Sequence, residues 1–199
     1  MTITYTIGRG LYLNITNRCS NNCAFCIRNN GDEVSGSGSL WLEREPSRDE
    51  ILDDILKYDL TDFDEIVFCG YGEPTERLGD LIWVAKKIKE NTNIKIRVNT
   101  NGHASLINGY DVTPLFEGAV DVVSISLNTP NADEYIKICR PEFGQDGYYG
   151  MLDFAGKVQN YVADVYLSVV KGTIHDDEIL LCQQIADDLG VKLRVRGMA

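Results

Sequence analysis

Short apolar runs alternate with longer amphipathic stretches along the chain. Runs with apolar residues at every second position predict strands, and apolar residues three and four positions apart predict helices. The expected strands are residues 11–16, 64–69, 94–100, 120–127, 164–170 and 192–196. The expected helices are residues 47–59, 76–91, 131–138, 148–161 and 176–189. This alternation predicts an α/β fold with parallel strand pairing and right-handed helical crossovers.

Local signals support several of these boundaries. Ser47 and Glu50 have the spacing of a capping box before an apolar run. Gly190 stands where the last helix should end. Residues 8–10 (Gly-Arg-Gly) fit the turn of a short N-terminal β-hairpin, and the Gly/Ser-rich segment 31–39 is expected to be a mobile loop. The prediction is therefore a partial, open (β/α)6 barrel preceded by a hairpin, in one domain of residues 1–199.

Each expected strand has an apolar face and a polar face, because side chains alternate sides along a strand. The polar set comprises Tyr12, Asn14, Thr16, Lys95, Arg97, Asn99, Ser124, Ser126, Asn128, Arg194 and Arg196. The apolar face has to pack against the helices. The polar face is therefore expected to line the inside of the open barrel, since a parallel sheet seldom leaves a face to water.

Composition narrows the functional classes. The 199 residues are 44% hydrophobic and 25% charged, which is typical of a soluble domain with its own core. The net charge of −11 argues against general binding to nucleic acids or anionic membranes. No apolar run reaches the length of a membrane span, and the first residues lack the features of a signal peptide. We expect a cytoplasmic protein whose six cysteines stay reduced, which favours metal binding over disulfides.

Polar or glycine-rich segments follow all six expected strands. They are residues 19–26, 70–74, 99–102, 126–128, 168–172 and 194–197. In parallel α/β folds, ligand sites form where the carboxyl ends of the strands meet. These six segments therefore predict one composite site.

Three cysteines, Cys19, Cys23 and Cys26, lie directly after the first of these strands. A [4Fe–4S] cluster normally takes four thiolates, so three would leave one iron for a small molecule. A structural zinc ion in a non-catalytic interaction module is the alternative, and it needs a fourth ligand. The candidates for that ligand are His103, Cys69 and His175. Three unrelated buried thiols remain a third interpretation, which the polar neighbours of the cysteines disfavour.

The cysteine spacing, with Phe25 before the last cysteine, resembles the signature of radical S-adenosylmethionine (SAM) enzymes. The segment Gly72-Glu73-Pro74 resembles the motif that follows the second strand in that family. In more detail, essentially the whole chain resembles the TatD-associated radical SAM proteins. The segments that carry this likeness are CSNNCAFCIRN, LWLEREP, FCGYGEPTER, RVNTNG, SISLNTP and CRPEFG. The resemblance implies a radical SAM core domain without an auxiliary cluster domain.

The resemblance also implies how cofactors are held. Cys19, Cys23 and Cys26 would ligate three irons of a [4Fe–4S] cluster, and SAM would chelate the fourth. The further positions that the resemblance implies are Phe25 at the adenine, Gly70, Tyr71, Gly72 and Glu73 at the methionine amino group, and Asn99, Ser126 and Asn128 at the carboxylate and ribose. One position departs from the family: the usual Gly-Gly-Glu-Pro here begins with Tyr71.

The implied activity is reductive cleavage of SAM to methionine and a 5′-deoxyadenosyl radical, which abstracts hydrogen from a substrate. The implied partners are an electron donor such as flavodoxin or ferredoxin, a TatD-type hydrolase, and a substrate that is either a small molecule or a protein or peptide. Arg97, Arg194 and Arg196 share the polar face without an evident acidic partner. Because unpaired buried charges are costly, we expect an anionic substrate, with Arg194 or Arg196 as the alternative partner of the SAM carboxylate.

The remaining cysteines and histidines carry weaker expectations. Cys69 and Cys182 lie within a predicted strand and helix and are expected in the apolar core. His103 and His175 are expected at the surface or at helix caps.

Overall fold

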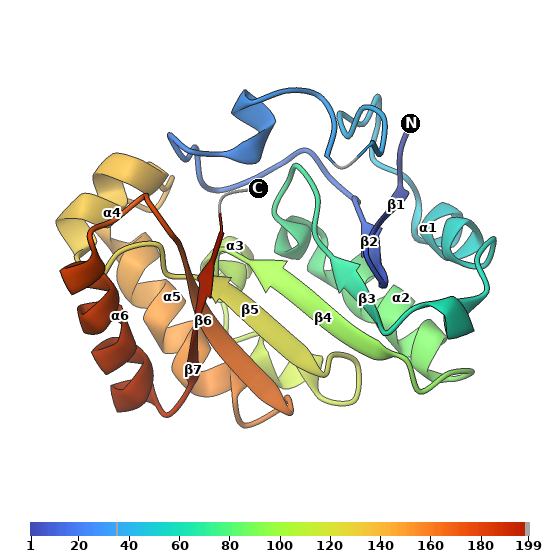
Figure 1. The fold of residues 1–199 in the computed structure, drawn as a ribbon. Coiled ribbons are helices and arrows are strands. Elements are labelled where there is room, and N and C mark those ends of the chain that lie inside the picture. Colours follow the sequence, from blue (N-terminus) through green and yellow to red (C-terminus); the bar gives the residue numbers. More distant parts are fainter. Residues whose placement is uncertain (35, 198–199) are drawn as a thin grey trace.

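The sheet organises the molecule. The computed structural model describes residues 1–34 and 36–197 (Figure 1). The strands are β1 (Thr4–Ile7), β2 (Gly10–Leu13), β3 (Glu65–Phe68), β4 (Lys95–Thr100), β5 (Val122–Ser126), β6 (Asp164–Val170) and β7 (Lys192–Arg196). They lie side by side in chain order. β1 and β2 form an antiparallel hairpin, and every later pair is parallel. The two edges do not meet, so the prediction of an open partial barrel with an N-terminal hairpin is confirmed.

The helices cover one face of this sheet. They are α1 (Arg48–Ile55), α2 (Leu78–Lys89), α3 (Ala104–Asn108), α4 (Ala132–Cys139), α5 (Gln145–Val158) and α6 (Asp176–Leu189). Short 3-10 turns are η1 (Ile27–Asn29), η2 (Leu60–Asp62), η3 (Pro74–Arg77) and η4 (Thr113–Phe116). In Figure 1 the helices lie behind and beside the sheet, while the face turned toward the reader carries no helix. No helix of the described residues is long and apolar enough to cross a bilayer.

Helix caps explain where several elements start and stop. The backbone N–H of Glu50 donates to Ser47 Oγ at 3.2 Å, and the Glu50 carboxylate accepts from the Ser47 N–H at 2.8 Å. This confirms the capping box. Asn131 caps α4 by accepting two backbone N–H groups, and Gly190 ends α6 with a left-handed φ of 72°. A left-handed residue stops a helix, and glycine adopts it without a Cβ penalty.

Several boundaries differ from the sequence prediction. α1 ends at Ile55 rather than residue 59, because Asp59 caps the separate turn η2. α2 begins at Leu78, because residues 74–77 form the turn η3, which Glu73 caps. β2 ends three residues early and α5 lies three residues earlier than expected. The five-residue helix α3 was not predicted. Residue 35 of the segment expected to be mobile lies outside the described residues.

The two faces of the sheet have the predicted chemistry. The helix-covered face is mainly apolar, and its buried strand residues include Leu11, Leu13, Ile66, Phe68, Ile96, Val98, Val123, Ile125 and Leu167. On the opposite face, which we call the inner face, strand register places Asn99 beside Ser124 and Ser124 beside Tyr166. The same register aligns Ser126, Ser168 and Arg194. The sequence prediction of a polar inner face is therefore confirmed.

Candidate functional site

The loop that carries the three cysteines, residues 14–26, is held in place by backbone hydrogen bonds. It pairs in antiparallel fashion with the segment that leaves α4, and Asn21 and Pro141 form a β-bridge. The bonds are Asn22 N to Cys139 O (3.0 Å), Ala24 N to Ile138 O (2.8 Å) and Glu142 N to Ser20 O (2.8 Å). The cysteine loop is therefore fixed against the carboxyl end of α4, at the edge where the parallel strands end.

The thiols of this loop differ from a core cysteine. Cys19, Cys23 and Cys26 are half-buried, whereas Cys139 is buried. Burial raises the pKa of the Cys19 thiol to about 12. A hydrogen bond with Cys139, followed by burial, raises the pKa of Cys23. Three soft, partly accessible donors fit an iron–sulfur cluster, and a metal that binds them has to displace their protons.

The zinc alternative depends on ligands that converge on one ion. Among residues 1–34 and 36–197, no three His, Cys, Asp or Glu side chains do so, Cys19, Cys23 and Cys26 included, so the side-chain positions favour neither zinc nor a cluster. His103, a candidate fourth ligand, uses both ring nitrogens within the protein: Nδ1 lies 3.0 Å from Ser20 Oγ and Nε2 lies 3.1 Å from Tyr135 Oη. Burial lowers the pKa of His103 to about 4, so the ring is neutral near pH 7.

A buried polar cluster underlies the cysteine loop. We call it the histidine cluster, and it consists of Ser20, Asn21, Asn101, His103 and Tyr135. Besides the two His103 contacts, Asn101 Nδ2 donates to Ser20 Oγ at 2.9 Å, and Asn21 Nδ2 donates to Tyr135 Oη at 3.2 Å. His103 is the N-cap residue of α3, one of the two positions expected for it, but it is fully buried rather than at the surface. The cluster joins the loop to β4 and α4.

The glycines after β3 are required by close backbone packing. A Cβ on Gly70 would lie 2.8 Å from Asn14 Cα, and a Cβ on Gly72 would lie 2.6 Å from Arg18 O. Real Cβ atoms do not approach backbone atoms so closely. The glycine turn, residues 70–74, therefore lies directly against the cysteine loop.

Glu73 fastens the glycine turn to the end of β4. Its Oε1 accepts from Thr75 Oγ1 and Thr100 Oγ1, both at 2.7 Å, and from Thr75 N at 3.0 Å, while its Oε2 accepts from Asn101 N at 2.7 Å. Burial raises the pKa of this carboxyl, and the four hydrogen bonds oppose that shift. All four donors belong to the protein. The predicted contact of Glu73 with a cofactor stays a prediction, because the bonds of its carboxylate are all made within the protein.

Tyr71, the residue that departs from the family pattern, packs in a small buried cluster with Tyr5 and Leu40. It is almost fully buried, and its hydroxyl donates to Gly31 O at 2.6 Å. Its ring meets the edge of Trp41 with ring centroids 5.2 Å apart. Its backbone N–H donates to Asn14 Oδ1 at 3.2 Å. The tyrosine side chain therefore holds the segment around residues 31–41.

The other predicted cofactor residues surround the same edge. Phe25 is partly buried and packs against the apolar core. Asn99 Oδ1 accepts from Arg97 Nη1 at 2.6 Å, and Ser126 lies half-buried at the end of β5. Asn128 is buried with a left-handed φ of 63°, and its Nδ2 lies 3.3 Å from Cys139 Sγ. A left-handed non-glycine residue is uncommon and marks a conformation that the surrounding structure enforces.

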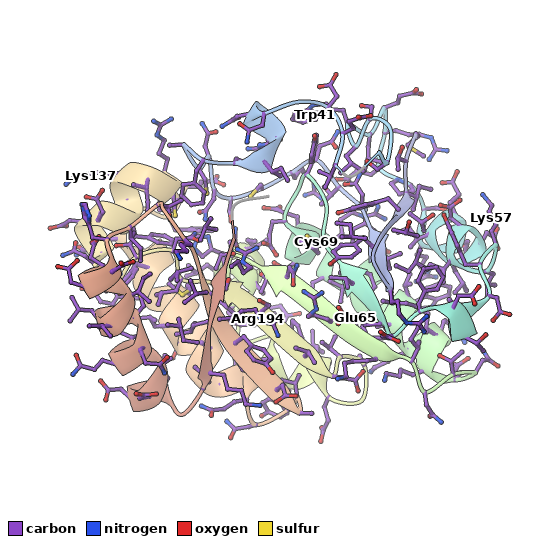
Figure 2. The ribbon with its side chains drawn as sticks, in the orientation of Figure 1. Trp41, Lys57, Glu65, Cys69, Lys137 and Arg194 are labelled. Carbon is purple, nitrogen blue, oxygen red and sulfur yellow. The ribbon has the colours of Figure 1, made fainter. Side chains whose placement is uncertain are left out.

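Two expectations about the inner face are wrong. Arg97 has an acidic partner, because its Nη2 lies 2.6 Å from Glu65 Oε1 on the neighbouring strand. Cys69 is not in the apolar core: it is half-buried and hydrogen-bonded to Asn99, and burial raises its thiol pKa. Figure 2 shows Glu65, Cys69 and Arg194 on the helix-free face. Cys182 is fully buried, as predicted.

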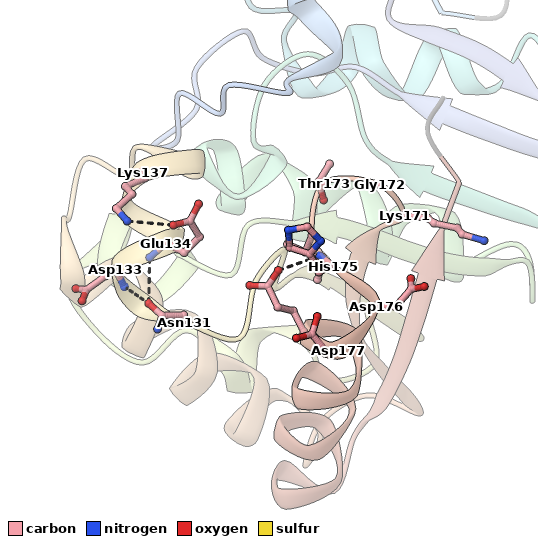
Figure 3. A pocket seen from close by; sticks show the side chains of 12 residues that line it. Asn131, Asp133, Glu134, Lys137, Lys171, Gly172, Thr173, His175, Asp176 and Asp177 are labelled. Atoms are coloured by element: carbon pink, nitrogen blue, oxygen red, sulfur yellow. Dashed lines mark hydrogen bonds and ion pairs between the residues drawn. The ribbon is translucent and has the colours of Figure 1, made fainter.

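A wide cleft lies beside this site rather than in it. It separates the N-terminal ends of α4 and α6 and has a volume of about 1020 Å³ (Figure 3). Its lining includes Glu134, which pairs with Lys137 at 3.2 Å, and His175, whose backbone N–H donates to Glu178. None of the predicted cofactor residues lines the cleft. The bonds that Asn131 Oδ1, Glu134, Lys137 and His175 make stay within their own helices, and we assign the cleft no role.

The geometry defines a class of protein. It is an open, mostly parallel α/β barrel whose first parallel strand leads into a half-buried three-cysteine loop, with a glycine turn packed against that loop. The chain matches the model of the Radical SAM superfamily over residues 13–180, and it belongs to that superfamily. Members of this class of enzymes use a [4Fe–4S] cluster and SAM.

The curated relatives are longer proteins than this chain. The chain is 30% identical over 169 residues to the GTP 3′,8-cyclase of Lactiplantibacillus plantarum, covering 84% of this chain and 47% of the relative. A Pyrococcus furiosus tungsten-containing aldehyde ferredoxin oxidoreductase cofactor-modifying protein is 30% identical over 131 residues, covering 64% of this chain and 33% of the relative. The chain thus spans half or less of the curated relatives it matches.

Solved structures support the fold. Streptococcus suis SuiB, bound to its precursor peptide SuiA, aligns with a TM-score of 0.65 at 13% identity, covering 98% of this chain and 40% of SuiB. A radical SAM methyltransferase from Sphaerobacter thermophilus aligns with a TM-score of 0.60 at 14% identity, covering 98% and 68%. At these identities the likeness concerns the fold alone.

Proposed function

We propose that Cys19, Cys23 and Cys26 bind a [4Fe–4S] cluster, that the remaining iron binds SAM, and that the protein abstracts a hydrogen atom from a substrate. When bound, these cofactors supply one-electron cleavage of the sulfonium carbon–sulfur bond, yielding methionine and a 5′-deoxyadenosyl radical. The observation that carries the proposal is the cysteine loop itself: three half-buried thiols follow the first parallel strand at the carboxyl edge of the sheet.

The chain's own residues would position the cofactor. We assign the backbone of residues 70–72 to the methionine amino group, since the glycines keep side chains away from the cysteine loop. Glu73 acts indirectly, because its four hydrogen bonds hold the glycine turn against β4. The other proposed contacts are Phe25 with the adenine, and Asn99, Ser126 and Asn128 with the carboxylate and ribose.

Anaerobic reconstitution tests this function. The wild-type protein should hold about four iron and four sulfide per chain and form 5′-deoxyadenosine from SAM in the presence of a reductant. Alanine variants of Cys19, Cys23 and Cys26 should lose the cluster. Cys182→Ala is the matched control, because that thiol is buried within α6. A Cys23→Ala protein with full iron content and an unchanged visible spectrum would contradict the assignment.

The finer family assignment and the partners belong to the same proposal. The segments quoted above support placement among the TatD-associated radical SAM proteins, with a TatD-type hydrolase as partner and flavodoxin or ferredoxin as electron donor in the cytoplasm. The test is reduction of the reconstituted cluster by flavodoxin, together with affinity purification against a TatD-type hydrolase. Lack of both would argue against these partners without affecting the cluster assignment.

A further inference from the structure

The inner face carries more positive than negative strand residues, although the whole chain has a net charge of −11. Strand register assigns both groups to this face. The cations are Lys95, Arg97, Lys192, Arg194 and Arg196, and the carboxylates are Glu65 and Asp164. A positive surface inside an acidic protein is a local feature that needs a physical reason.

Only part of this positive charge is neutralised. Arg97 pairs with Glu65 at 2.6 Å, and Lys192 pairs with Asp164 at 2.5 Å. Both carboxylates of the inner-face strands are therefore in use. The other three cations, Lys95, Arg194 and Arg196, form no ion pair with any residue that the structure describes. The two arginines also make no side-chain hydrogen bond there.

The two arginines lie near each other on β7, and stacking on a tyrosine ring orients one of them. The Arg194 guanidinium lies 4.1 Å from the ring centroid of Tyr166, and stacking on a ring leaves its N–H edges free. Arg196 follows two residues later on the same face, about 7 Å along the strand. Burial lowers the pKa of Arg196, and the nearby charges of Arg194 and Arg97 lower it further. Arg196 as a whole residue is exposed to solvent.

These charges lie toward the cofactor end of the inner face. Arg196 is close enough to Cys69 for each side chain to affect the pKa of the other. Cys69 directly precedes Gly70, the first residue of the glycine turn. A group bound between the arginines would therefore lie on the side of the sheet where the glycine turn begins.

We propose that Arg194 and Arg196 form a clamp that binds a phosphate group of the substrate. The two arginines of the clamp match the charge of a dianion, and a phosphate monoester carries close to two negative charges near pH 7. Guanidinium N–H groups bind phosphate oxygens in a forked geometry. The statement that the bound phosphate belongs to a substrate rests on the proposed function. The clamp itself is testable by binding alone.

The experiment measures binding of pyrophosphate, malonate and SAM to the reconstituted protein by calorimetry at low ionic strength. The variants are Arg194→Gln and Arg196→Gln. The matched control is Lys95→Gln, which removes the same charge from the amino-terminal end of β4 on the same face. We expect each arginine variant to weaken pyrophosphate binding at least tenfold, the control to change it less than twofold, and SAM affinity to stay within twofold in all three.

Several outcomes would overturn the clamp. They are no pyrophosphate binding by the wild type, equal loss in Lys95→Gln, tighter binding of malonate than of pyrophosphate, or loss of SAM binding without loss of pyrophosphate binding. The last result would assign the arginines to the carboxylate of SAM. Iron content and SAM cleavage, measured on the same samples, report on the proposed function separately, because pyrophosphate binding needs no radical chemistry.

Discussion

Two polar regions of the molecule differ in how fully their groups are paired. In the histidine cluster and the glycine turn, buried side chains bond almost entirely to other protein groups; the exception among the described residues is Asn21 Oδ1. On β7, Arg194 and Arg196 have no acidic partner among the described residues. Paired buried groups maintain a shape, and unpaired charges remain available to a ligand. The comparison separates residues that build the site from residues that bind at it.

The largest expected effect is a loss of stability in the region whose polar groups are paired. Gly72→Ala should lower the free energy of unfolding by about 3 kcal/mol or more, because its Cβ would meet the backbone of the cysteine loop. Gly79→Ala is the control: no atom lies within 4 Å of its Cβ, and it should stabilise α2 by about 0.5–1 kcal/mol. Urea denaturation measures both. Equal stability of Gly72→Ala and the wild type would contradict the close packing.

Acid should weaken the histidine cluster next. The unfolded chain protonates His103 near its ordinary pKa of 6.5, whereas the folded protein does so only at about pH 4. Stability from the neutral ring is thus complete above pH 6.5 and is lost as pH falls toward 4, by about 3 kcal/mol in total. The free-energy difference between wild type and His103→Gln should therefore shrink over that range. A constant difference would show that His103 does not titrate this way.

Paired and unpaired arginines should respond differently to the same substitution. Arg97→Gln should cost about 2 kcal/mol of stability, because it leaves the partly buried Glu65 without its partner. Arg194→Gln and Arg196→Gln should change the free energy of unfolding by no more than about 0.5 kcal/mol, because no ion pair is lost. Denaturant titrations of the three variants in one buffer make the comparison. Similar losses in all three would mean that the β7 arginines also serve the fold.

The smallest effect concerns a surface cap outside both regions. Hydrogen bonds from Arg44 and the Ser47 N–H lower the pKa of Glu50 from 4.5 to about 2. Its contribution to stability is present above pH 4.5 and is lost as pH falls toward 2. Glu50→Gln should slightly lower the melting temperature at pH 7 and flatten its decline over that acid range. An unchanged acid profile would show that the capping carboxylate does not titrate as stated.

Local signals predicted much of the fold. The Ser47–Glu50 spacing located the start of α1, and Gly190 located the end of α6. Alternation along strands separated the apolar face from the polar inner face, because burial of one face imposes a period of two. The cysteine spacing and the glycines at 70 and 72 marked two neighbouring parts of the site. These features depend on contacts within a few residues or on strand periodicity.

Contacts between residues far apart in the chain were not predicted. The partner of Arg97 is Glu65, 32 residues earlier, and only the register of β3 against β4 brings them together. His103 is buried because Ser20 and Tyr135, far away in the chain, meet its two ring nitrogens. No period or spacing signals such contacts. The helix α3 is shorter than two turns, too short for a recognisable apolar pattern.

The pairing of the cysteine loop with the end of α4 has a consequence for local opening. The amides of Asn22, Ala24 and Glu142 donate across one short ribbon, and β-bridge geometry joins Asn21 to Pro141. Their hydrogen–deuterium exchange should therefore slow or quicken together, as one cooperative unit. Arg140, with a left-handed φ of 47°, lies inside this unit. Any event that unwinds the last turn of α4 would release the thiol-bearing loop at the same moment.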